Sequence, residues 1–142
     1  MQKKTQELLT LMKSSKDYET YSKTVENELL PEPEKLADVL AYHLTQQKRK
    51  KEDVIKASGL SVSYGYNIFK GERHPGRDKV IMLCIGLGLD AAQTQTLLQR
   101  TGYAALYGRV KRDNAILFGL DRKLSVMELN ELLYELGLEI LW

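Results

Sequence analysis

The sequence predicts an all-α protein, and three observations support that fold class. The apolar residues of every periodic segment recur at the three- and four-residue spacing of a helix, and no stretch alternates as a strand does. Apolar residues make up 43% of the 142 positions, which is enough for a real core. Only three prolines occur, and two of them stand close together in one break of the helical pattern.

Two short helices are expected before that break, near residues 4–14 and 17–30. In the second helix, side chains at spacings of three and four form one apolar stripe: Tyr18, Tyr21, Val25 and Leu29. The break itself is Pro31-Glu32-Pro33, because proline disfavours helix at the residue before it. Residues 1–33 are therefore predicted to form an N-terminal helical arm.

A series of short helices is expected in the middle of the chain. In order, the elements are a helix at 34–47, a helix at 51–58, a helix from about 62 to 70, a loop at 71–76 and a helix that begins at Arg77. Gly59 closes the second of these helices, since glycine tolerates the left-handed backbone common there. Ser61 is placed to cap the third helix.

Charge is unevenly distributed along the chain, although the net charge is only +2. Residues 43–79 carry nine basic and four acidic side chains, whereas residues 1–42 and 80–142 each carry more acidic than basic ones. A local basic excess is expected of a surface that binds phosphates. An ordinary solvated face would also produce it, so charge alone leaves both interpretations open.

Residues 77–106 align without gaps on residues 112–141, at an offset of 35. The identical pairs are Arg77/Arg112, Asp78/Asp113, Ile81/Ile116, Leu89/Leu124, Leu97/Leu132, Leu98/Leu133, Gly102/Gly137 and Leu106/Leu141. Both second helices open with a capping-box pattern, Asp90-x-x-Gln93 and Ser125-x-x-Glu128. A helix-pair repeat explains this period, and so do two unrelated hairpins that share caps and leucines. On either interpretation, a helical hairpin at 107–142 packs on the preceding helices.

The stretch LADVLAYHLTQQKRKKEDVIKASGLSVSYGYNIFKGERHPGRDKVIMLCIGLGLD resembles the phage-repressor/Cro-like (XRE) helix-turn-helix domain. The resemblance covers roughly residues 36–98, and its landmarks are Gly59, Leu60, Ser61, Ile68, Gly71 and Pro75. It implies a lambda-repressor-like helix-turn-helix bundle at 34–106, between the arm and the hairpin. It also implies a sequence-specific DNA-binding regulator of transcription in a bacterium or phage. The whole chain resembles small bacterial regulators that carry extra C-terminal helices.

Two positions depart from the family pattern at the expected crossing of the two motif helices. The fifth position of the first motif helix is normally small but is Ile55 here, and a normally large position of the recognition helix is Gly65. Interiors pack densely, so an exchange that conserves volume is tolerated better than either change alone. We predict that Gly65 makes room for Ile55. Phe69, where the family often carries glutamate, is expected in the core.

The resemblance also implies which side chains meet double-stranded DNA. Base contacts fall to Lys51, Val62, Ser63 and Asn67, and the amide of Asn67 is the most informative because it can bond adenine N6 and N7 together. Contacts to the phosphate backbone fall to Ser61, Lys70 and Arg73. We also expect such contacts from Tyr66, on or near the exposed side of the helix, and from Arg77 and Lys79, which extend the basic surface. Tyr66 is also placed to pack on a thymine methyl or to join a protein interface. The base-reading set is small, so we expect paired half-sites read by a homodimer.

Other chemistry finds little support in the sequence. His43 and His74 have no third ligand, so no metal site is expected, and Cys84 fits a small buried hydrophobe. No phosphate loop, catalytic triad or dinucleotide fingerprint occurs, so we predict no enzyme, no cofactor and no small-molecule ligand. Neither a long apolar run nor a secretory leader is evident, which favours a cytoplasmic protein without membrane contact.

A rival interpretation belongs to a different class of function. The chain would then be a helical adaptor that binds another protein and no longer reads DNA, as the small base-reading set, the aromatic recognition helix and the added hairpin favour. The apolar end Leu141-Trp142 is expected to dock on the protein's own core or on a second chain.

Overall fold

The computed structural model describes residues 5–142, and these residues form α-helices and one 3-10 helix without any strand. The prediction of an all-α fold is confirmed. The chain divides into two compact units, Met1–Glu32 and Pro33–Trp142. Among the described helices, none combines the length and the apolar character that crossing a membrane requires.

The first unit contains three short elements: α1 (Thr5–Ser14), α2 (Tyr18–Val25) and the 3-10 helix Glu26–Glu28. The first corresponds to the helix expected at 4–14, of which residue 4 lies outside the described residues. The second ends earlier than expected from the pattern at 17–30. Acidic side chains follow α2 in the 3-10 helix, and negative charge at a helix C-terminus opposes the helix dipole.

The apolar stripe expected on α2 is largely exposed. Val25 is buried, whereas Tyr18 is 72% exposed and Leu29 is 55% exposed. Tyr21 lies over α1 and donates a hydrogen bond to the carbonyl of Leu8 at 3.4 Å. The two helices therefore contact each other but leave most of their apolar side chains on the surface of this unit.

The second unit contains the remaining helices: α3 (Leu36–Gln47), α4 (Lys51–Ser58), α5 (Val62–Phe69), α6 (Arg77–Gly86), α7 (Ala91–Arg100), α8 (Lys111–Asp121) and α9 (Val126–Glu135). As predicted, α4 ends at Gly59, whose φ of +77° lies in the left-handed region. Ser61 stands at the N-cap of α5, but its side chain makes no capping hydrogen bond. The expected cap is therefore present in backbone position only.

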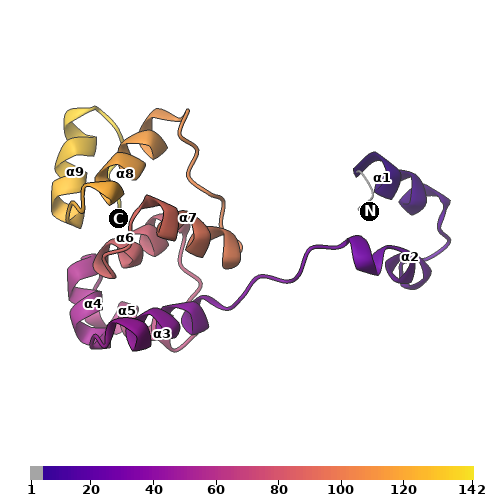
Figure 1. Cartoon of the computed structure of the whole chain (residues 1–142), viewed down its shortest axis with the longest axis horizontal. Coiled ribbons are helices and arrows are strands. Elements are labelled where there is room, and N and C mark those ends of the chain that lie inside the picture. The colour runs from indigo at the N-terminus through magenta and orange to yellow at the C-terminus, as the bar shows by residue number, and fades with distance from the viewer. Residues whose placement is uncertain (1–4) are drawn as a thin grey trace. The chain divides into compact units, whose positions relative to one another are not determined.

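Helix α6 is the centre of this unit, with α4 and α5 on one side and α8 and α9 on the other (Figure 1). Its side chains are buried almost all the way round the helix, and Val80, Ile81 and Leu83 are fully enclosed. Cys84 is enclosed as well, as predicted. One continuous apolar core therefore joins the helices of the motif to the C-terminal hairpin.

The hairpins α6–α7 and α8–α9 repeat the same hydrogen bonds at the offset of 35. Both predicted capping boxes are present, at the start of α7 and at the start of α9. The side-chain amide of Gln95 bonds both the N–H and the carbonyl of Leu106, and the amide of Asn130 does the same with Leu141. Each hairpin thus has the same two side-chain hydrogen bonds at equivalent positions. This agreement favours a true duplication over two hairpins that merely share caps.

Two ion pairs join the repeats crosswise. Arg77 of the first copy pairs with Asp113 of the second at 2.9 Å, and Arg112 of the second pairs with Asp78 of the first at 2.8 Å. The arginine of each copy thus pairs with the aspartate of the other copy. Such reciprocal contacts are produced by a two-fold axis. The two hairpins are thus related by an approximate two-fold axis inside one chain.

Candidate nucleic-acid interface

Helix α5, the expected recognition helix, is held against α3 and α4 by one side of its surface. Gly65, Ile68 and Phe69 form this buried side, and Phe69 is only 8% exposed, as predicted for a core residue. Because successive residues of a helix rotate by about 100°, Ser63 and Asn67 lie on the opposite, outward side. The outward side is the one available to a partner.

Of the expected base-reading residues of α5, Ser63 and Asn67 share this outward side, whereas Val62 is in line with Gly65 and Phe69, at the exposed first position of the helix. Val62 is 41% exposed, Ser63 is exposed and Asn67 is half-buried. Within the described residues, no hydrogen bond engages the side chain of Ser63 or the side-chain amide of Asn67. Both polar groups are therefore free to bond a ligand.

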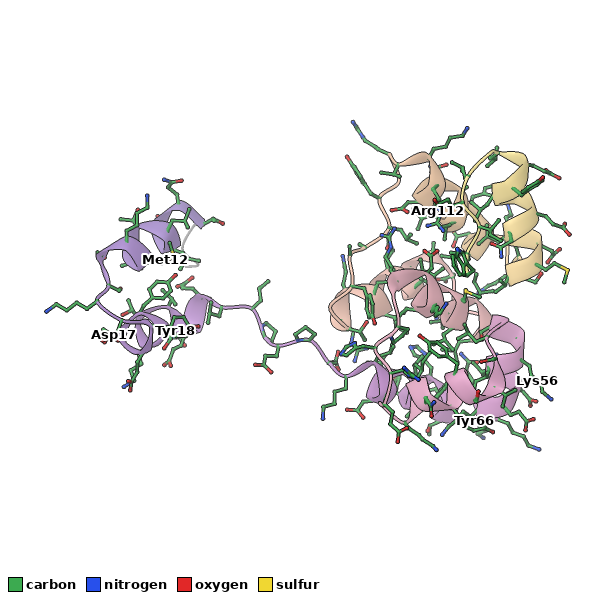
Figure 2. The ribbon with its side chains drawn as sticks, turned by 180° about the vertical axis from the view of Figure 1, so that it is seen from behind. Met12, Asp17, Tyr18, Lys56, Tyr66 and Arg112 are labelled. Carbon is green, nitrogen blue, oxygen red and sulfur yellow. The ribbon has the colours of Figure 1, made fainter. Side chains whose placement is uncertain are left out.

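Lys51 lies on one flank of α5 rather than in the middle of its outward side. Its Nζ is 5.8 Å from the ring centre of Tyr66 and 5.6 Å from that of Phe69. A cation over an aromatic face is attracted by the ring's negative charge density. The ammonium group of Lys51 therefore lies beside the recognition helix, over these two rings of α5. Tyr66 itself lies at the lower edge of the second unit (Figure 2).

Lys79 occupies the other flank. Its Nζ is 5.7 Å from the ring centre of Tyr64 and 5.8 Å from that of Trp142. Tyr64 is one helical position from Ser63 and about 100° round the helix, on the side away from Tyr66. Lys79 was expected on this surface, whereas Tyr64 and Trp142 were not, because no local pattern brings the segment after α9 close to α5.

Lys70 and Arg73 line a groove of about 710 Å³ between the start of α3 and the loop that follows α5. His74 lines it too, and so does the carboxylate of Glu34. Arg100 binds that carboxylate through two hydrogen bonds and thereby lowers the pKa of Glu34. Lys70 and Arg73 themselves form no ion pair within the described part of the chain. Their charges remain available to an anion.

Arg77, expected on the phosphate-binding surface, points elsewhere. Its guanidinium donates to Asp113 at 2.9 Å and to the carbonyls of Ala104 at 3.4 Å and Ala105 at 3.2 Å, and the side chain is 28% exposed. The group is therefore committed to the contact between the two hairpins. The repeat aligns Arg77 with Arg112 and Asp78 with Asp113. The alignment does not reveal that each arginine forms its ion pair with the aspartate of the other copy.

His43 and Cys84 are further titratable side chains whose pKa is shifted. Partial burial lowers the pKa of His43, with Arg100 adding to the effect, and burial raises the pKa of Cys84 to about 12. In residues 5–142, no group of three His, Cys, Asp or Glu side chains is arranged to hold a metal ion. Comparisons of the chain with protein-family models, with curated proteins and with solved structures gave no match.

Proposed function

We propose that the chain binds double-stranded DNA through α5, as a transcription regulator of the repressor-like helix-turn-helix type, encoded by a bacterium or a phage and acting in the bacterial cytoplasm. One observation carries this proposal. Lysines from two different helices, Lys51 of α4 and Lys79 of α6, stand on opposite flanks of α5, each over aromatic rings of that helix.

Cations on both flanks of one helix suit B-DNA. A helix in the major groove, which is about 12 Å wide, has a phosphate backbone on either side of it. Cations on both flanks of the helix would meet both backbones and so fix its register, without reading sequence. Lys51 is accordingly assigned here to a phosphate rather than to a base.

Sequence would be read between the flanks. Asn67 and Ser63 offer unbonded polar groups on the outward side of α5, and Val62 offers an exposed apolar side chain. An amide that bonds adenine N6 and N7 together discriminates strongly, whereas a hydroxyl accepts several bases. So short a base-reading set goes with two half-sites and a homodimer, as in other two-fold regulators.

Fluorescence anisotropy of a labelled duplex tests the proposal, at about 50 and 200 mM salt. With four cations on the phosphates (Lys51, Lys70, Arg73 and Lys79), the affinity should fall about a hundredfold as salt rises over that range. Each neutralised phosphate contributes about 0.9 to the slope of log affinity against log salt. The double variant Lys70→Ala/Arg73→Ala should bind much more weakly. The control, Arg109→Ala/Lys111→Ala, removes two exposed cations at the start of α8. Absence of binding by the wild type at the lower salt would refute the proposal.

A second candidate function, protein binding, is favoured by a different surface. An apolar groove of about 730 Å³ lies between α4 and α9, and its lining includes Ala57, Val126 and Ile140. Met127 and Tyr134 also line it, and they are 73% and 80% exposed. Large exposed apolar side chains around a groove mark interaction sites. Binding there would respond far less to salt than binding to phosphates, so the titration separates the two functions.

A further inference from the structure

The segment after α9 is fixed to the body of the second unit by its backbone. Arg112 donates to the carbonyls of Glu139 at 2.9 Å and Ile140 at 3.2 Å. Asn130 bonds the N–H of Leu141 at 2.7 Å and its carbonyl at 3.0 Å, and the Leu141 side chain is 1% exposed. Leu141 therefore docks in the protein's own core, and the position of the next residue is set by it.

The next residue, Trp142, is exposed to solvent rather than buried. Its side chain is 77% exposed, yet its indole ring lies 5.8 Å from the Nζ of Lys79. The same ammonium group lies 5.7 Å from the ring of Tyr64 on α5. A large aromatic ring is thus held open to a partner, beside an unpaired cation, on one flank of the helix proposed to read DNA.

We infer that Trp142 belongs to the surface that contacts DNA, where its indole packs against the sugar–phosphate backbone that Lys79 binds. This inference rests on the proposed function. The indole presents an apolar face to a deoxyribose and an N–H donor to a phosphate oxygen, and it has few rotatable bonds to immobilise. It also restrains the ammonium group of Lys79, so the C-terminal hairpin contributes directly to the interface.

Trp142 is the single tryptophan of the chain, so its fluorescence reports on this contact without a label. In the whole 142-residue chain without DNA, Lys79→Met should shift the emission of Trp142, because the charge beside the indole is removed. On addition of an unlabelled duplex at low salt, quenching of the emission by acrylamide should fall, because the backbone covers the ring.

Affinity for the duplex provides the second arm of the test. Trp142→Ala should weaken binding about two- to tenfold, the fold-change that corresponds to one hydrogen bond lost between the indole N–H and a phosphate oxygen. The matched control is Tyr107→Ala, which removes the counterpart of Trp142 in the first copy of the repeat, a side chain that is 60% exposed. This control should bind as the wild type does.

The outcomes separate the inference from the proposed function. If the wild type binds the duplex but Trp142→Ala binds equally well and acrylamide quenching is unchanged in the complex, the inference is wrong and the proposed function stands. If the wild type does not bind the duplex at low salt, the proposed function fails and the inference fails with it. Loss of affinity in Trp142→Ala alone, together with shielding of the indole, supports both.

Discussion

Gly65 of α5 packs directly against the side chain of Ile55 of α4. A β-carbon placed on Gly65 would lie 2.8 Å from Cγ1 and 3.0 Å from Cδ1 of Ile55, and closer still to Cγ2. Real β-carbons do not approach neighbours this closely, so a residue other than glycine requires the isoleucine to move. The expectation that Gly65 makes room for Ile55 is confirmed, and it explains why the recognition helix tolerates a glycine in its interior.

The first prediction concerns this packing pair. Gly65→Ala should destabilise the fold by about 1–3 kcal/mol, because overpacking outweighs the better helix propensity of alanine. Ile55→Ala should cost about 2–5 kcal/mol, since it leaves a cavity at a fully buried site. The double variant should be more stable than the sum of the two losses predicts, as measured by chemical denaturation.

A control for that cycle is Gly108→Ala, because a β-carbon on Gly108 has no neighbour within 4 Å. It should be close to neutral, within about 0.5 kcal/mol. Strict additivity of the changes at Gly65 and Ile55 would show that the two residues do not share their space.

The second prediction concerns the crossed ion pairs. Asp113 is 5% exposed and accepts hydrogen bonds from Arg77 at 2.9 Å and from the backbone N–H of Tyr107 at 2.8 Å. Asp113→Ala should cost about 1–3 kcal/mol, because both donors lose their acceptor. Asp78→Ala should cost less, since the side chain of Asp78 is 29% exposed and water can replace it. Equal costs in urea melts of the two variants would contradict this account.

The third prediction is a pH dependence at the start of the second unit. Hydrogen bonds from Arg100 lower the pKa of Glu34 below its ordinary value of 4.5. A carboxyl group whose pKa is depressed by folding stabilises the fold above its unfolded pKa and loses that effect as pH falls through its folded pKa. Glu34→Gln should therefore have a lower Tm than the wild type at neutral pH, and the difference should vanish in acid. A difference in Tm that persists in acid would contradict this account.

The fourth prediction concerns Cys84. Burial in α6 raises the pKa of its thiol to about 12, so almost no thiolate exists in the folded protein at mildly alkaline pH. Modification by a disulfide reagent should be slow in native buffer and should accelerate with denaturant as the core opens. Rapid, complete modification of the native protein would show that α6 is far more accessible than the structure indicates.

Local signals in the sequence predicted most of the helix ends in the second unit. Gly59 closes α4 because glycine adopts the left-handed backbone there without strain, and the capping boxes at Asp90 and Ser125 form as their spacing predicted. The end of α2 was predicted wrongly, because an apolar period continues through Leu29 although the helix does not. A period describes which residues share a face, not where backbone hydrogen bonding ceases.

The candidate interface was harder to predict, because its contacts join residues far apart in the chain. The aromatic support of Lys51 and Lys79 depends on the packing of three helices, and Trp142 reaches Lys79 only because Leu141 is anchored in the core. From the sequence, Arg77 was expected on the basic surface that meets phosphates, yet its charge is neutralised by Asp113. Side-chain type indicates which chemistry is available, whereas tertiary packing decides which side chains are free to use it.

The salt dependence of DNA binding by single lysine variants tests the central claim most directly. If Lys51 and Lys79 meet the two phosphate backbones on either side of α5, then Lys51→Gln and Lys79→Gln should each reduce the slope of log affinity against log salt by about 0.9. Lys56→Gln, which removes a lysine of α4 paired with Glu52 at 3.3 Å, should leave the slope unchanged. Equal slopes for all three variants and the wild type would contradict the claim that α5 lies between the two backbones.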